Sequence, residues 1–68
     1  MYMSVNYILC KAEPGQNISH FADEVVYQMN EHRSRAIAVF NDVYIEVDST
    51  MTAEDIEREY FKLTWKEN

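Results

Sequence analysis

The residues that could do chemistry are few in this chain, and the only cysteine is the first candidate. Cys10 follows a run of strand-forming residues, Tyr7 to Leu9. A reactive thiolate needs a helix start or a nearby base that lowers its pKa, and a strand supplies neither. We therefore expect Cys10 to be a small apolar side chain in the protein interior, and we expect no catalytic residue there.

Metal and cofactor sites are equally poorly supported by the residue spacing. His20 and Glu24 are one helical turn apart and could hold a metal with a further carboxylate, but such pairs arise often by chance on acidic helices. The chain has one cysteine and two histidines, whereas structural zinc takes four such ligands. His32 reads as a favourable cation at a helix end. We expect no metal.

Phosphate-binding loops and acid–base pairs are not indicated either. The single glycine, Gly15, follows Pro14 in a turn, whereas a loop that cradles phosphates needs several glycines. Two carboxylates that act as acid and base need a cleft that separates their pKa values, and a chain of 68 residues offers little to build one. The sequence predicts no cofactor and no enzyme activity.

The densest cluster of acidic residues is more typical of a capped helix than of a nucleic-acid mimic. Four acids fall within six residues: Glu54, Asp55, Glu57 and Glu59. A mimic needs carboxylates ranged along one surface, but helical geometry scatters these four around the axis, and Glu54 can pair with Arg58. Folding could still gather acids from other segments, namely Glu24, Glu31, Asp42, Glu46 and Asp48. Mimicry therefore stays an alternative.

Apolar and aromatic residues are the better binding signal. If Arg35–Phe40 and Val43–Asp48 pair through a tight turn at Asn41-Asp42, one face of the hairpin is a core face with the pairs Phe40/Val43, Ala38/Ile45 and Ala36/Val47. Trp65 falls off the buried stripe of the last helix, where it either folds over the rim of the core or stays exposed. The candidate partner-binding residues are Ile37, Val39, Tyr44 and Glu46 on the other hairpin face, with Phe61 and Trp65.

Composition limits the chain to a single domain over residues 1–68 and limits its partners. Twelve acidic residues against six basic ones give a formal charge of −6, which opposes binding to nucleic acid or to anionic membranes. The longest apolar run, Ala36–Phe40, is far shorter than the roughly 20 residues of a membrane span. The lone cysteine, and the lack of a secretory signal in Met1–Ser4, predict a reducing cytoplasm.

The elements that would position these residues follow the order β-α-β-β-α. Met3–Ala12 reads as a strand that is apolar on both faces, as in the interior of a sheet. Ser19–His32 reads as an amphipathic helix capped by Asn17 or Ser19, with Asp23 and Glu24 near its positive end. Its buried stripe is Ile18, Phe21, Ala22, Val25 and Met29, and Tyr27 points away.

The last helix is predicted from its start signal and its periodicity. Thr52 is the N-cap, Asp55 completes a capping box, and Met51 and Ile56 occupy staple positions. The helix should run to about Lys66, with a buried stripe of Ala53, Ile56, Tyr60 and Leu63. The predicted fold is a small α+β domain, a three-stranded sheet with both helices on one face, in which the first strand pairs with either strand of the hairpin.

The short acidic chain, with its hairpin Ala36–Val47 followed by Thr52–Ile56, resembles in style many small phage or prophage accessory proteins. This resemblance covers about half of the chain and rests on no functional motif. It implies a stoichiometric inhibitor or modulator of a host cytosolic protein. The alternatives are a homo-oligomeric structural or assembly protein, which would gain stability from self-association, and an acidic nucleic-acid mimic.

Overall fold

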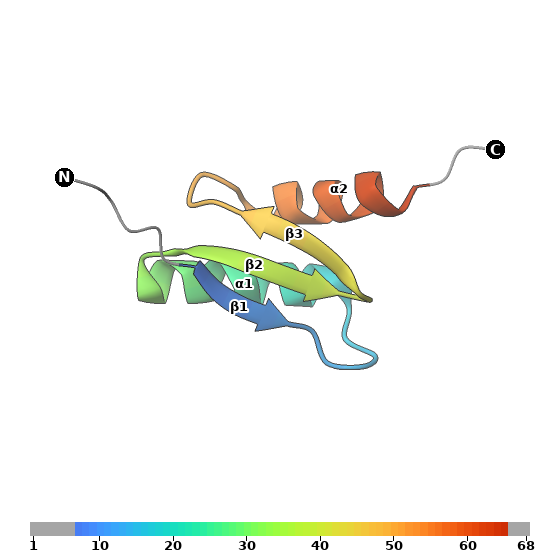
Figure 1. Ribbon diagram of the computed structural model, residues 1–68, viewed down its shortest axis with the longest axis horizontal. Coiled ribbons are helices and arrows are strands. Elements are labelled where there is room, and N and C mark those ends of the chain that lie inside the picture. The colour runs from blue at the N-terminus through green and yellow to red at the C-terminus, as the bar shows by residue number, and fades with distance from the viewer. Residues whose placement is uncertain (1–6, 66–68) are drawn as a thin grey trace.

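The computed structural model describes residues 7–65 and has the predicted order of elements in one small α+β domain (Figure 1). A three-stranded mixed sheet packs against two helices. The elements are β1 (Tyr7–Lys11), α1 (Ile18–His32), β2 (Arg35–Phe40), β3 (Val43–Val47) and α2 (Ala53–Thr64). The prediction of a β-α-β-β-α domain is confirmed.

The hairpin has the predicted register. Phe40 pairs with Val43, Ala38 with Ile45 and Ala36 with Val47. The turn residues Asn41 and Asp42 have φ of 50° and 64°, the left-handed values that a two-residue hairpin turn requires. β3 ends at Val47, one residue before the predicted end.

The first strand is an edge strand, and the prediction of a strand inside the sheet is wrong. The sheet order is β1-β2-β3, with β1 parallel to β2. β2 takes the centre because the hairpin fills its other side, so β1 keeps an edge although both of its faces are apolar. β1 ends at Lys11, but the Ala12 N–H still donates to the Val39 carbonyl at 2.9 Å. The predicted stretch Met3–Asn6 lies outside the described residues.

The first helix packs its predicted stripe into the core. Phe21, Ala22, Val25 and Met29 are buried, and Ile18 packs at their margin. The Asn17 side chain accepts from the Ser19 and His20 amides, at 2.7 and 3.4 Å, so the helix begins at Ile18. The expectation that Asp23 and Glu24 sit at the positive end is wrong, because the helix starts early enough to leave the first turn without an acid.

The second helix begins as predicted and ends sooner. The Thr52 amide donates to Asp55 at 2.9 Å and the Asp55 amide donates to Thr52 Oγ1 at 3.2 Å, which completes the capping box. The helix ends at Thr64, and Lys66 lies outside the described residues. Arg58 pairs with Asp55 at 3.1 Å and not with the predicted Glu54.

The predicted burial of Leu63 is also wrong. Ile56 is fully buried and Tyr60 packs against the core, but the Leu63 side chain is 53% exposed. The edge-on contact of the Phe40 and Tyr60 rings, at 5.0 Å, lies one turn before Leu63. The last turn of α2 therefore extends beyond the end of the core, and the core does not cover Leu63.

Candidate functional site: the open face of the sheet

Both helices pack on the same side of the sheet, which leaves the opposite face open. Residues of the core side, such as Ala36, Ala38 and Ile45, are buried against the helices. Successive strand residues alternate between faces, so the residues between them point the other way. We call this surface the open face; its residues are Tyr7, Leu9, Lys11, Arg35, Ile37, Val39, Tyr44 and Glu46. In Figure 1 the strands lie in front of α1, so the open face of the sheet is turned toward the viewer.

Strand register arranges the open face in rows across the sheet. Leu9, Ile37 and Glu46 form one row. Lys11, Val39 and Tyr44 form the next, and Tyr7 pairs with Arg35 at the other end. Apolar side chains therefore occupy the centre of the face, and charged ones lie toward its corners.

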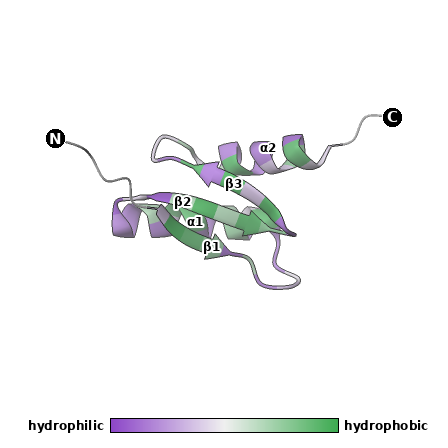
Figure 2. Ribbon diagram, viewed as in Figure 1, coloured by the Kyte–Doolittle hydropathy of each residue, from purple (hydrophilic) through white to green (hydrophobic). Residues whose placement is uncertain are grey.

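On the open face, the central strand contributes a buried side chain and the two outer strands contribute exposed ones. Leu9 on β1 and Tyr44 on β3 are each 69% exposed, whereas Val39 between the two strands is 5% exposed. Val39 is shielded because Lys11 and Tyr44 flank it and the chain after β1 stays close to its carbonyl. Figure 2 shows the hydrophobic β1 and β2 beside largely hydrophilic helices. The exposed side chains of Leu9 and Tyr44 thus border the apolar residues Ile37 and Val39 of the central strand.

One end of the open face carries a charged cluster. Tyr7, Arg35, Glu46 and Asp48 line a small hollow of about 130 Å³. A hydrogen bond with Tyr7 raises the pKa of Arg35, with smaller contributions from the nearby carboxylates. Hydrogen bonds from Thr50 lower the pKa of Asp48, with a further contribution from the Arg35 charge. This end places a cation near two carboxylates and can orient a partner that carries both signs of charge.

The structure unites four of the six predicted binding residues and separates the other two. Ile37 and Glu46 share a row of the open face, and Val39 and Tyr44 share the next. Phe61 and Trp65 are exposed, at 54% and 75%, but Phe61 lies on α2 and Trp65 caps its end, and α2 packs on the helix side of the sheet. Trp65 was expected either to fold over the rim of the core or to stay exposed, and in the structure it is exposed.

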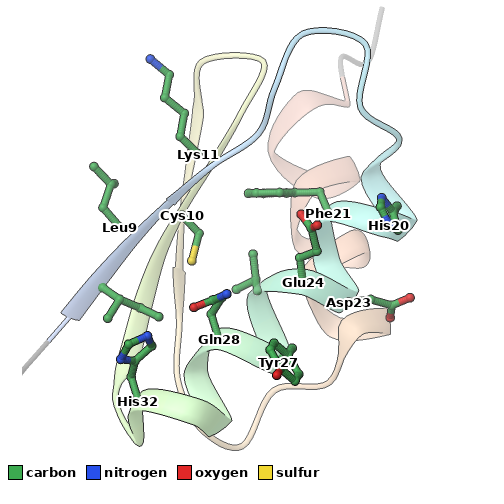
Figure 3. A pocket seen from close by; sticks show the side chains of 12 residues that line it. Leu9, Cys10, Lys11, His20, Phe21, Asp23, Glu24, Tyr27, Gln28 and His32 are labelled. Carbon is green, nitrogen blue, oxygen red and sulfur yellow. The ribbon is translucent and has the colours of Figure 1, made fainter.

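A second hollow lies between β1 and α1 and holds the titratable residues singled out in the sequence (Figure 3). It has a volume of about 630 Å³, and Cys10 points into it from β1. Burial, and secondarily the charge of Glu24, raises the pKa of the Cys10 thiol, which opposes a nucleophilic role at neutral pH. His20 and Glu24 lie on the helix side of this groove, and residues 7–65 contain no group of three possible metal ligands.

Sequence reasoning missed half of the open face. Tyr7, Leu9, Lys11 and Arg35 belong to it because β1 pairs with β2 in parallel, and the sequence left the neighbour of the first strand open. The two apolar faces of this strand were the available signal. One face packs toward the helices, and the other contributes Leu9 to the open face.

Comparisons with protein-family models, curated proteins and solved structures find no match, so the function has to be argued from the surface of the chain itself. Among the described residues no helix is both long enough and apolar enough to cross a membrane. The open face combines exposed apolar side chains with charged residues at its corners.

Proposed function

We propose that this chain is a protein-binding module that docks one partner protein on the open face and modulates it stoichiometrically. The observation that carries the proposal is that Leu9 on β1 and Tyr44 on β3 are each 69% exposed on the same face as Ile37 and the buried Val39 of the central strand. Exposed apolar patches on small soluble domains mark interaction surfaces more often than chance. The partner in this proposal presents an apolar ridge that fits between these two side chains.

Residue types on the open face suit a protein partner. Tyrosine and arginine are enriched in protein interfaces, where a rigid ring or a planar guanidinium contributes much contact area. Tyr44 supplies such a ring, and Arg35 supplies the guanidinium at the charged end. The expected contact has an apolar centre and an ionic rim, as in most specific protein interfaces.

Charge distribution separates the open face from the rest of the acidic molecule. With Asp48 of its charged end, the face has two cations, Lys11 and Arg35, and two anions, Glu46 and Asp48, so its net charge is about zero by formal count. The acids of the helices are Asp23, Glu24, Glu31, Glu54, Asp55, Glu57 and Glu59. A partner with a neutral rim therefore fits the open face, and the acidic helices repel nucleic acid from the opposite side.

Affinity capture with matched variants tests the proposal. Immobilised wild-type protein is incubated with nuclease-treated bacterial lysate beside Tyr44→Ala and Tyr27→Ala proteins. Tyr27 is a suitable control because it is 61% exposed but lies on α1, away from the open face. We expect one retained protein that Tyr44→Ala loses and Tyr27→Ala keeps. Retention that depends on Tyr27 and not on Tyr44 would contradict the proposed surface.

A further inference from the structure

The outer edge of β1 has main-chain groups available for pairing. The Ala12 N–H donates to the Val39 carbonyl of β2. Strand residues direct their amides alternately to the two sides, so Cys10 and Ile8 also face β2, whereas Leu9 and Lys11 direct theirs outward. Within residues 7–65 no strand pairs with this outer side. β1 therefore presents a template for one more strand.

The side chains of β1 also leave room for a neighbour. Ile8 and Cys10 point toward the helices but are only partly buried, because the groove between β1 and α1 lies beside them (Figure 3). On the other face Leu9 is 69% exposed. An unprotected strand edge of this kind is usually covered in native proteins. A strand added here would cover Leu9 and place side chains over the groove.

We infer that a second copy of this chain occupies this edge, with the two β1 strands antiparallel about a twofold axis at Leu9. The pairing joins the two three-stranded sheets into one continuous sheet, and both pairs of helices lie on the same side. It does not depend on the proposed docking of a partner protein: the edge contact covers Leu9 but leaves Val39 and Tyr44 of the open face uncovered. The dimer displays two open faces side by side.

The sequence of β1 matches itself in this arrangement. Leu9 pairs with Leu9 of the second copy on the open side, and Ile8 pairs with Cys10 on the helix side, so apolar side chains meet on both faces. Lys11 pairs with Tyr7 on the open side, where the lysine stem can lie along the ring. Tyr7, Leu9 and Lys11 are the residues with outward main-chain groups, so this register pairs outward groups with outward groups.

Charge also selects the β1 edge for contact between two acidic chains. The formal charge of −6 makes two copies repel, but β1 contains one lysine and no carboxylate. The two copies therefore meet at a strand that adds no acid-to-acid contact. The nearest carboxylate of α1 is Glu24, whose charge acts on Cys10 from across the groove.

The helices flanking the groove fit the same twofold axis. Gln28 lies one helical turn after Glu24 and also lines the groove (Figure 3). α1 runs opposite to β1, so the level of Glu24 corresponds to Cys10 and the level of Gln28 is nearer to Ile8. Since Cys10 of one copy pairs with Ile8 of the other, the twofold axis turns the groove side of α1 in one copy toward that of the second. Glu24 brings no free charge to this approach, because its carboxylate already accepts from Gln16 Nε2 at 2.8 Å within its own chain.

Disulfide trapping with two equally exposed positions tests the arrangement. In a Cys10→Ser background, Leu9→Cys places two thiols at the twofold axis, where paired Cα atoms are about 5.5 Å apart and within disulfide range. Tyr44→Cys is the matched control, because Tyr44 has the same exposure and lies on the same face but on β3. We expect mild oxidation to convert most of the Leu9→Cys protein into a covalent dimer and to leave Tyr44→Cys monomeric. Equal or preferred cross-linking of Tyr44→Cys would overturn the edge pairing in favour of face-to-face stacking.

Sedimentation of the uncross-linked protein gives an independent readout. The wild-type chain is expected to dimerise in a concentration-dependent manner. Leu9→Lys sets two cations opposite each other and should raise the dimer dissociation constant by about tenfold or more. Circular dichroism establishes that this variant keeps its fold. A wild-type protein that stays strictly monomeric at millimolar concentration, or a Leu9→Lys protein that dimerises equally well, overturns the inference.

Discussion

The rings of Phe40 and Tyr60 meet edge to face, with centroids 5.0 Å apart and an interplanar angle of 83°. Phe40 ends the central strand, and Tyr60 belongs to the third turn of α2. The Tyr60 hydroxyl also accepts from Asn41 Nδ2 at 3.1 Å. One side chain thus ties α2 to both the central strand and the hairpin turn, and this contact holds the sheet with its open face outward.

Truncation of Tyr60 should therefore destabilise the whole domain. We expect Tyr60→Ala to lower the free energy of unfolding by about 2–3 kcal/mol, because it removes the aromatic pair and leaves a cavity beside Phe40. Leu63→Ala is the matched control and should cost below about 0.5 kcal/mol, since Leu63 is on the same helix and 53% exposed. Urea unfolding followed by circular dichroism measures both. Equal losses for the two variants would show that α2 is held by other contacts.

The hairpin turn should accept glycine with a gain in stability. Asp42 has φ of 64°, a conformation in which glycine avoids the steric cost that a side chain incurs. We expect Asp42→Gly to raise the free energy of unfolding by about 0.5 kcal/mol and Asp42→Val to lower it by about 1 kcal/mol or more. Thermal unfolding at neutral pH gives both values. A stabilising valine would contradict the turn geometry.

Acid should weaken the domain through two carboxylates, Asp55 in the capping box of α2 and Asp48 in the turn after β3. The pKa of Asp55 is lowered by hydrogen bonds from Thr52 and that of Asp48 by hydrogen bonds from Thr50. A folded-state pKa below the unfolded value of about 3.9 contributes stability that is complete above about pH 5 and disappears as the pH falls through the folded value.

The capping contribution is measured by the pH dependence of unfolding. Stability of the wild-type protein should fall as the pH drops below about 5, and Asp55→Asn should flatten part of this fall. Glu54→Gln is a control in the same turn that leaves the capping box intact. An Asp55→Asn protein with an unchanged acid profile would refute the assigned role of the capping box.

The thiol of Cys10 should react slowly in the folded protein. Its pKa is raised by burial first and by the Glu24 charge second, so less thiolate is present at neutral pH than in the unfolded chain. We expect slower alkylation by iodoacetamide at pH 7.5 in buffer than in urea. Glu24→Gln should recover part of the rate. Equal rates in buffer and urea would mean that Cys10 is freely accessible.

The sequence predicted the elements that depend on local signals. Asn41 and Asp42 determined the hairpin register, since residues that tolerate positive φ at two adjacent positions define a two-residue turn. Thr52 and Asp55 determined the start of α2. The face shared by Ile37, Val39 and Tyr44 followed from this register alone.

The features that the sequence did not predict depend on contacts between distant segments of the chain. Apolar residues on both faces of β1 suggested an interior strand, but in a sheet of three strands the same pattern serves an edge strand that packs on one side and exposes Leu9 on the other. Helical periodicity placed Leu63 on the buried stripe, but periodicity does not report where the core ends. Trp65 was left between two readings for the same reason.

Photo-cross-linking at the open face tests the central claim most directly. A photoreactive benzoylphenylalanine replaces Tyr44 in one variant and Tyr27 in the other, and cells expressing each protein are irradiated. We predict a discrete adduct with one other protein from position 44 and none from position 27. Adducts from position 27 alone, or identical adducts from both, would contradict a partner-binding role for the open face.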